Sequence, residues 1–244
     1  MTDSLHRPLV VIPALNEQAS VAAVIADVRA HVPSARCVVV DDGSTDGTAA
    51  CARAAGADVL PLPFNLGVGG AMRAGFRHAR EHGYDVVIQV DADGQHDARY
   101  IPALIGMLAD ADIAIGARFA GEGEYGARGP RRWAMKALAW ALSRISGSTL
   151  TDATSGFKAH GPRAIRLFAH TYPAEYLGDT VEALVIAARG GLRIRQLPVV
   201  MRPRQGGAPS NGPLRSTMYL LRAGVALLLA LVRSRTTFPE ESAG

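Results

Sequence analysis

Residues 86–96 read Val-Val-Ile-Gln-Val-Asp-Ala-Asp-Gly-Gln-His, an apolar, β-branched run that ends in two carboxylates one residue apart. In an extended segment residues i and i+2 point to the same side, so we expect Asp91 and Asp93 to converge just beyond a buried strand. Two close carboxylates repel unless a cation lies between them or one binds a proton. Their hard oxygen atoms suit Mg²⁺ or Mn²⁺. For an isolated Asp-x-Asp the alternative is a polar turn at a strand end, where Asp and Gly are common.

Polar residues also follow two other predicted strands. The apolar runs 9–12 and 37–40 each predict a short buried strand. After these strands come Asn16 and Glu17, and Asp41 and Asp42. Helical periodicity separates the strands, which predicts an α/β fold with a Rossmann-like, mostly parallel central sheet flanked by helices. Ligands of such sheets bind at the carboxyl ends of the strands, where these side chains lie.

The remaining pattern extends this alternation along the chain. We expect further strands at 59–60, 113–115 and within 192–200, and the stretch 151–158 is polar at its start and strand-like at its end. Helices are expected at 19–31, 48–55, 71–82, 100–108, 131–145 and 181–189. The length predicts one large domain or one domain with an appendage, and we place the main domain at residues 1–211 and an apolar segment with an acidic tail at residues 212–244. The apolar run 217–232 is short for a bilayer span, and its basic neighbours fit a helix in the membrane interface. A core or dimer helix is the alternative.

Charge is distributed unevenly along the chain. Residues 1–117 hold 8 basic and 14 acidic side chains, whereas residues 118–235 hold 18 basic and 6 acidic ones. Almost all of the basic residues in 118–235 are arginine. An arginine-rich half suggests an anionic partner such as phosphate groups or a lipid surface. Aromatic residues are few and not interleaved with the basic ones, so we expect no nucleic-acid partner. The sparse pair Cys37 and Cys51, and the lack of a secretory signal at residues 1–8, favour a cytoplasmic protein.

Two other features carry weaker signals. Residues 67–70, Gly-Val-Gly-Gly, do not follow the first strand and lack the G-x-G-x-x-G spacing, so they do not predict a nicotinamide enzyme. They instead favour close packing where a helix begins near phosphates. His96 follows the Asp pair and is either a site residue or a hydrogen-bonded structural histidine.

Three motifs together resemble family-2 glycosyltransferases of the GT-A fold. They are residues 11–17 (Val-Ile-Pro-Ala-Leu-Asn-Glu), 39–47 (Val-Val-Asp-Asp-Gly-Ser-Thr-Asp-Gly) and 91–96 (Asp-Ala-Asp-Gly-Gln-His). Residues 116–119, 154–158 and 204–207 resemble the polyprenyl-phosphate branch of that family, the dolichyl-phosphate mannose synthase-like enzymes. The resemblance covers about residues 8–215.

This resemblance implies a role for each matching residue. The residues expected around the nucleotide are Pro13, Leu15, Glu17, Asp42, Gly43 and Ala92. Asp91 and Asp93, with Gln95 as a further ligand, would hold Mg²⁺ or Mn²⁺ and the diphosphate. Arg118 and an arginine of the pair Arg131 and Arg132 would face the acceptor phosphate, and Arg202 or Arg204 would close over the diphosphate.

The implied reaction is an inverting, metal-dependent transfer of a sugar from a GDP- or UDP-linked donor to a polyprenyl phosphate, at the cytoplasmic face of a membrane. The sequence departs from the branch at residues 133–136 and 208–211, on the acceptor side. Transfer to a hydroxyl group is therefore an alternative, and Asp152 would then be the candidate base. The sequence also leaves open a nucleotidyltransferase and a non-catalytic, membrane-associated partner of a larger synthase. We also allow for a homodimer.

Overall fold

The computed structural model describes residues 7–118, 139–174 and 179–204. Its strands are β1 (Pro8–Ala14), β2 (Arg36–Asp41), β3 (Asp58–Pro61), β4 (Val86–Gln89), β5 (Ile113–Ala117), β6 (Lys158–His160) and β7 (Ile194–Pro198). Its helices are α1 (Val21–His31), α2 (Thr48–Ala54), α3 (Gly67–Glu81), α4 (Ile101–Gly106), α6 (Pro162–Thr171) and α7 (Asp179–Arg189), with 3₁₀ turns η1 (Ala98–Tyr100) and η2 (Met107–Ala109). Residues 139–146 are also helical.

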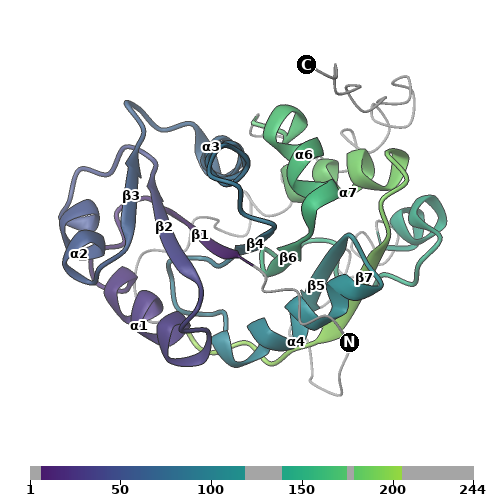
Figure 1. The fold of residues 1–244 in the computed structure, drawn as a ribbon, viewed down its shortest axis with the longest axis horizontal. Coiled ribbons are helices and arrows are strands. Elements are labelled where there is room, and N and C mark those ends of the chain that lie inside the picture. Colours follow the sequence, from purple (N-terminus) through teal and green to yellow (C-terminus); the bar gives the residue numbers. More distant parts are fainter. Residues whose placement is uncertain (1–6, 119–138, 175–178, 205–244) are drawn as a thin grey trace, which may run out of the picture.

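The described strands form one sheet in the order β3-β2-β1-β4-β6-β5-β7 (Figure 1). All neighbouring pairs are parallel except those of β6, which runs antiparallel to both β4 and β5. The predicted α/β fold with a mostly parallel sheet is therefore confirmed. The carboxyl ends of β1, β2 and β4 lie at one edge, as the polar residues after these strands require.

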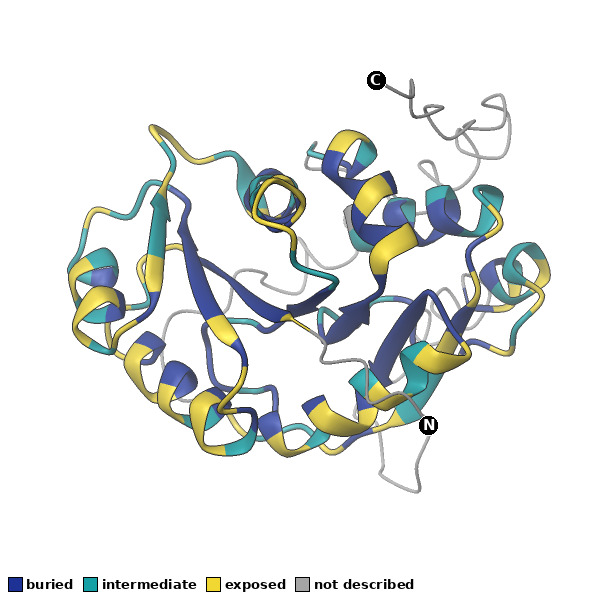
Figure 2. Ribbon diagram, in the orientation of Figure 1, coloured by how far each residue is buried: buried dark blue, intermediate teal, exposed yellow. Residues whose placement is uncertain are grey.

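Helices cover both faces of the sheet, and alternate strand residues enter two separate cores. Leu9 and Val11 of β1 pack in the core under α3, α6 and α7, whereas Val10 and Ile12 pack in the core under α1 and α4. All four side chains are buried, as expected for a sheet with helices on both sides. Figure 2 shows the inner strands largely buried, whereas the edge strands β3 and β7 and the outward faces of the helices are more exposed.

Several expected elements have different bounds in the structure. Helix α3 begins at Gly67 rather than residue 71, so its first turn includes the glycines, and Gly70 packs closely there: a Cβ on Gly70 would lie 2.4 Å from Leu66 Cβ. Helix α6 was not expected. Of the helix predicted at 131–145, residues 139–145 are confirmed and the rest lie outside the described residues, as does the appended segment 212–244. Among the helices that the structure describes, none is long and apolar enough to cross a membrane.

Candidate active site

The turns that follow β1 and β2 are fastened to each other by hydrogen bonds. Asn16 has a left-handed φ of 55°. Its backbone N–H donates to Ser44 Oγ over 3.0 Å, and its side-chain Oδ1 accepts from the Thr45 N–H over 2.9 Å. The Glu17 N–H donates to Thr48 Oγ1 over 2.8 Å. The strained Asn16 backbone is thus held from both sides, and the neighbouring Leu15 side chain remains 41% exposed at the strand edge.

Asp42 connects the end of β2 to the start of α3. Its Oδ1 accepts from Leu66 N–H over 2.7 Å, and its Oδ2 accepts from Gly67 N–H over 2.9 Å. Burial raises the pKa of Asp42 above its ordinary value, although these two N–H groups oppose the shift. Gly43, with a φ of 79°, brings the same turn against the backbone of Phe64 and Asn65. Both residues therefore fix the wall of the predicted nucleotide pocket.

Asp91 lies two residues after the end of β4, just before a turn, and His96 contacts it. Residues 92–93 form a turn closed by Gly94 at a φ of 77°, so the two carboxylates are not presented by an extended strand as expected. The Asp91 N–H donates to His96 Nδ1 over 3.0 Å, which leaves the proton of a neutral imidazole on Nε2, 3.5 Å from Asp91 Oδ2. Burial lowers the pKa of His96, against the attraction of Asp91 and Asp93.

His96 is fixed in turn by Phe157. The two rings stack with centroids 4.8 Å apart and an interplanar angle of 15°. The His96 side chain is only 2% exposed, whereas that of Asp91 is 40% exposed. The histidine is therefore the hydrogen-bonded, buried partner of the carboxylate, and the carboxylate faces outward to where a ligand would bind.

Asp93 is the more enclosed carboxylate and is paired with Arg204. Its Oδ1 accepts from the Gln95 N–H over 3.0 Å, and its Oδ2 lies 3.1 Å from Arg204 Nη2. The same Arg204 nitrogen lies 3.9 Å from Glu17 Oε1. Arg204 therefore joins the turns after β1 and β4, and it brings a positive charge to the carboxylate edge.

Gly156, which precedes β6, leaves the space that the Asp91 carboxylate occupies. A Cβ atom on Gly156 would lie 3.0 Å from Asp91 Oδ2, 3.1 Å from Asp91 Oδ1 and 3.3 Å from Gln89 Nε2. Such distances are shorter than ordinary carbon–oxygen contacts. Any side chain at this position would push the carboxylate away, so the glycine is part of the site.

On the other side of β6, Arg118 and Asp152 form a pair. Arg118 Nε lies 2.8 Å and Nη2 lies 3.2 Å from the two Asp152 carboxylate oxygens, and Nη2 also donates to Thr154 Oγ1 over 2.8 Å. Burial alone would raise the pKa of Asp152, but the hydrogen bonds and charge of Arg118, with two backbone N–H groups, hold it below the ordinary value. Asp152 is therefore an ionised partner of Arg118.

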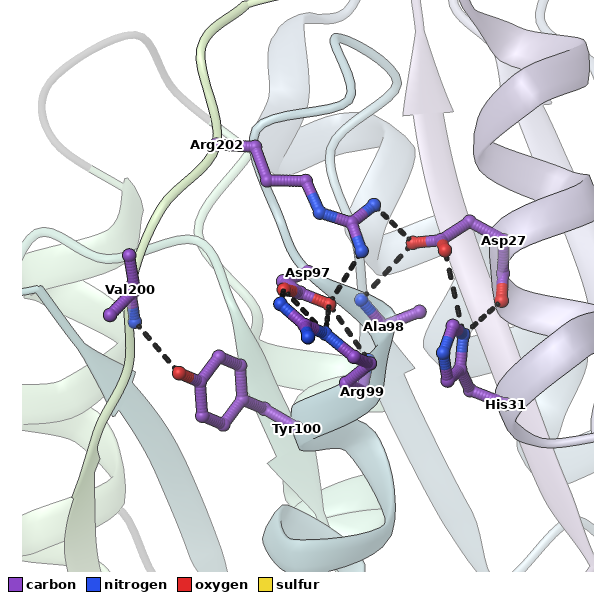
Figure 3. Close-up of polar contacts among 8 residues, drawn as sticks. All are labelled: Asp27, His31, Asp97, Ala98, Arg99, Tyr100, Val200 and Arg202. Carbon is purple, nitrogen blue, oxygen red and sulfur yellow. Dashed lines mark hydrogen bonds and ion pairs between the residues drawn. The ribbon is translucent and has the colours of Figure 1, made fainter.

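Arg202 and Arg204 are two residues apart but contact different groups. Arg202 Nη1 donates to Asp27 Oδ2 over 2.8 Å, and Nη2 donates to Asp97 Oδ1 over 2.7 Å (Figure 3). Asp97 also binds the Arg99 guanidinium, whose hydrogen bonds lower the Asp97 pKa to about 2. Arg202 thus anchors the segment after β7 to α1 and η1, and places Arg204 at the carboxylates.

The residues present fit a divalent cation that takes most of its ligands from a substrate. Within the described ranges no three His, Cys, Asp or Glu side chains are grouped as a complete metal site. Mg²⁺, however, is usually bound through one or two carboxylates plus waters and substrate phosphates. Asp91, in the space left by Gly156, and Asp93 supply such oxygen atoms. Gln95 is partly exposed beside them, and its side chain forms no hydrogen bond with the residues that the structure describes.

The structure thus brings together most of the predicted site. Arg204 contacts both Glu17 and Asp93, and Asp91 lies two residues before Asp93. Pro13 is buried in β1 and Ala92 in the β4 turn. Arg131 lies outside the described residues, and Arg202 contacts Asp27 and Asp97. Sequence reasoning missed the role of Gly156 and the exposed Phe64 beside Gly43.

This constellation at the carboxyl edge of an α/β sheet is the one expected of a nucleotide-sugar glycosyltransferase. The model of glycosyl transferase family 2 matches residues 9–170, and the chain belongs to that family. It is therefore a glycosyltransferase.

Named relatives refine this comparison. Undecaprenyl-phosphate mannosyltransferase of Micrococcus luteus is 35% identical over 213 residues, which are 82% of this chain and 86% of the relative. Polyprenol monophosphomannose synthase of Mycolicibacterium smegmatis is 29% identical over 225 residues, 88% and 85% of the two chains. Among solved structures, glucosyl-3-phosphoglycerate synthase of Mycobacterium tuberculosis, in complex with Mn²⁺, UDP-glucose and phosphoglyceric acid, has a TM-score of 0.70 at 23% identity over 98% of this chain and 82% of that one. This likeness confirms the GT-A fold.

Proposed function

We propose that the protein transfers a sugar, with inversion and with the aid of Mg²⁺ or Mn²⁺, from a nucleoside-diphosphate sugar to a polyprenyl phosphate at the cytoplasmic membrane surface. The names of the two relatives support the lipid phosphate. The Mn²⁺ and UDP-glucose of the structural neighbour support the donor and the cation. The donor sugar and base would be selected by the pocket that Pro13, Leu15, Glu17, Asp42 and Gly43 border.

The Arg118–Asp152 pair is the observation that carries the choice of acceptor. A hydroxyl acceptor must lose a proton to a base, and an effective base has a pKa near the working pH. Asp152 has a lowered pKa and both of its oxygen atoms bound by Arg118. It is therefore a poor base. A phosphate acceptor is already anionic at neutral pH and needs no base, but it does need N–H donors, such as the partly exposed guanidinium of Arg118.

The remaining residues act on the diphosphate. Asp91 and Asp93, with Gln95, would hold the cation, which supplies charge neutralisation to the leaving diphosphate when bound. His96 keeps the Asp91 carboxylate in one orientation, and Arg204 would add a second positive charge. Catalysis then consists of aligning two anions for one in-line displacement at the anomeric carbon. A single displacement inverts the anomeric configuration.

An acceptor panel tests this function. Purified protein with Mn²⁺ is given GDP- and UDP-sugars and one of three acceptors: a polyprenyl phosphate, the same polyprenol without phosphate, or a free sugar. We expect a lipid-linked sugar phosphodiester only with the first acceptor, with the anomer opposite to that of the donor. Transfer to the alcohol or to the free sugar in place of the lipid phosphate would refute the proposed acceptor, and retention of the anomer would refute the single displacement.

A further inference from the structure

A cavity of about 520 Å³ lies between α3 and α6. Its lining residues are Arg73, Arg77, Arg80 and Glu81 of α3, and Ala169 and His170 of α6. Figure 1 shows these two helices side by side above the sheet. The three arginines follow at intervals of four and three residues, which places them on one face of the helix. We refer to this cavity as the arginine groove.

Positive charge in the arginine groove is largely uncompensated. Arg73 Nε donates to the Tyr172 carbonyl oxygen over 2.8 Å, and Arg80 contacts His170 Nε2, so neither of these contacts involves a carboxylate. Arg77 is exposed and forms no ion pair or hydrogen bond with any residue that the structure describes. Glu81 is the single acidic residue among the lining residues that the structure describes. Three guanidinium groups therefore face one carboxylate.

The helices that carry these arginines are packed rigidly against each other. Phe76 of α3 is completely buried, and its ring centroid lies 5.2 Å from those of both Phe168 and Tyr172. Arg166 precedes His170 by four residues on α6, so it extends the basic surface beside the groove. Because the backbone is fixed, binding an anion here requires ordering only of the side chains.

We propose that the arginine groove binds the phosphodiester headgroup of an anionic phospholipid, and that the flank formed by α3 and α6 rests on the membrane. Guanidinium groups match the geometry of phosphate oxygen atoms through paired N–H donors. Among the described residues of the lining there is no Phe, Tyr or Trp ring for a nucleobase, and Ala169 is the one apolar residue, which favours a headgroup over a nucleotide or a single nucleic-acid strand. This contact goes beyond the proposed function, because binding a bilayer lipid requires no sugar transfer.

Vesicle sedimentation of the full-length protein tests the groove. The probes are phosphatidylcholine vesicles with and without about 30% of the anionic lipid phosphatidylglycerol. The test variant is Arg77→Gln/Arg80→Gln. The matched control is Arg36→Gln/Arg53→Gln, which removes the same charge from exposed positions in β2 and α2. Each basic residue near an anionic surface strengthens binding about fivefold, so the test variant should bind the anionic vesicles about thirtyfold more weakly, and the control much less so.

The outcomes separate a headgroup site from a general charge effect and from a site for a free anion. Equal weakening of both variants would show a general effect of net charge and would overturn the proposal, as would unchanged binding of the test variant. Titration with inorganic phosphate forms a second arm: saturable binding of phosphate that needs Arg77 and Arg80, without any change in vesicle binding, would assign the groove to a free anion instead. Thermal unfolding of both variants and transfer to a detergent-dispersed acceptor should match those of the wild type.

Discussion

Gly156→Ala is the substitution that most sharply separates the candidate site from the fold around it. The new Cβ would lie 3.0 and 3.1 Å from the two Asp91 carboxylate oxygens, whereas ordinary contacts begin at 3.4 Å. The carboxylate must therefore move by a few tenths of an ångström. Gly156 does not have a positive φ, so alanine causes no backbone strain.

The expected costs to activity and to stability differ. Misplacement of a catalytic group by 1 Å can cost about a hundredfold in rate, so a shift of about 0.4 Å should lower kcat/KM about tenfold. Affinity for Mn²⁺ should fall as well, because metal–ligand distances tolerate only about 0.2 Å. Stability should change by less than about 1 kcal/mol, since the Asp91 side chain is 40% exposed and can turn outward.

The assay compares Gly156→Ala with Gly106→Ala. A Cβ on Gly106 meets nothing within 4 Å, and this helix position should gain up to about 1 kcal/mol without any change in activity. Steady-state transfer, Mn²⁺ titration and urea unfolding are measured for both variants. Wild-type kcat/KM and wild-type Mn²⁺ affinity in a folded Gly156→Ala protein would refute the assignment of Asp91 to the reacting centre.

Three further substitutions test the surrounding structure. Arg202→Gln removes two charge-assisted hydrogen bonds and should cost about 2 kcal/mol in urea unfolding, with a lower kcat/KM because Arg204 loses its anchor; unchanged kcat/KM would contradict the anchoring role. Burial, aided by the charge of Lys158, lowers the pKa of His160 to about 3. Below pH 6.5 the unfolded chain therefore binds a proton at this histidine that the folded protein does not. The free energy of unfolding should fall by about 1.4 kcal/mol for each pH unit below about 6.5. In the variant His160→Gln, the free energy of unfolding should depend on pH less steeply between pH 6 and 4, by about 1.4 kcal/mol per pH unit. An unchanged pH dependence would contradict the lowered pKa of His160. Asp152→Asn should leave the pH profile of transfer unchanged and reduce kcat less than a hundredfold, whereas loss of a titrating limb would identify Asp152 as a base.

The sequence was sufficient to predict the location of the site, because the polar site residues directly follow recognisable strands in the chain. An apolar run followed by Asp91 and Asp93, and two other polar strand ends, placed the site at one edge of a parallel sheet, because parallel strands end together. The α6 helix also has a usable signal, since Pro162 suits a first helical turn and Ile165, Phe168 and Ala169 repeat at helical spacing.

The remaining features depend on contacts between distant residues. Gly156 lies 65 residues after Asp91 in the chain, and nothing in its own neighbourhood indicates that it touches a carboxylate. Arg202 and Arg204 share one basic segment rich in glycine and proline, and only the packing against Asp27 and Asp97 distinguishes the anchoring arginine from the one at the site.

The central claim is that the carboxylates after β4 hold a divalent cation together with a nucleoside diphosphate. Isothermal titration of the wild type and of Asp91→Asn/Asp93→Asn with UDP and with GDP, each with and without Mn²⁺, measures this directly. We predict that one of the two nucleotides binds the wild type at least tenfold more tightly with Mn²⁺, and that the double variant loses this dependence while staying folded. Equal affinity of the wild type with and without Mn²⁺, or an unchanged Mn²⁺ dependence in the double variant, would contradict the claim.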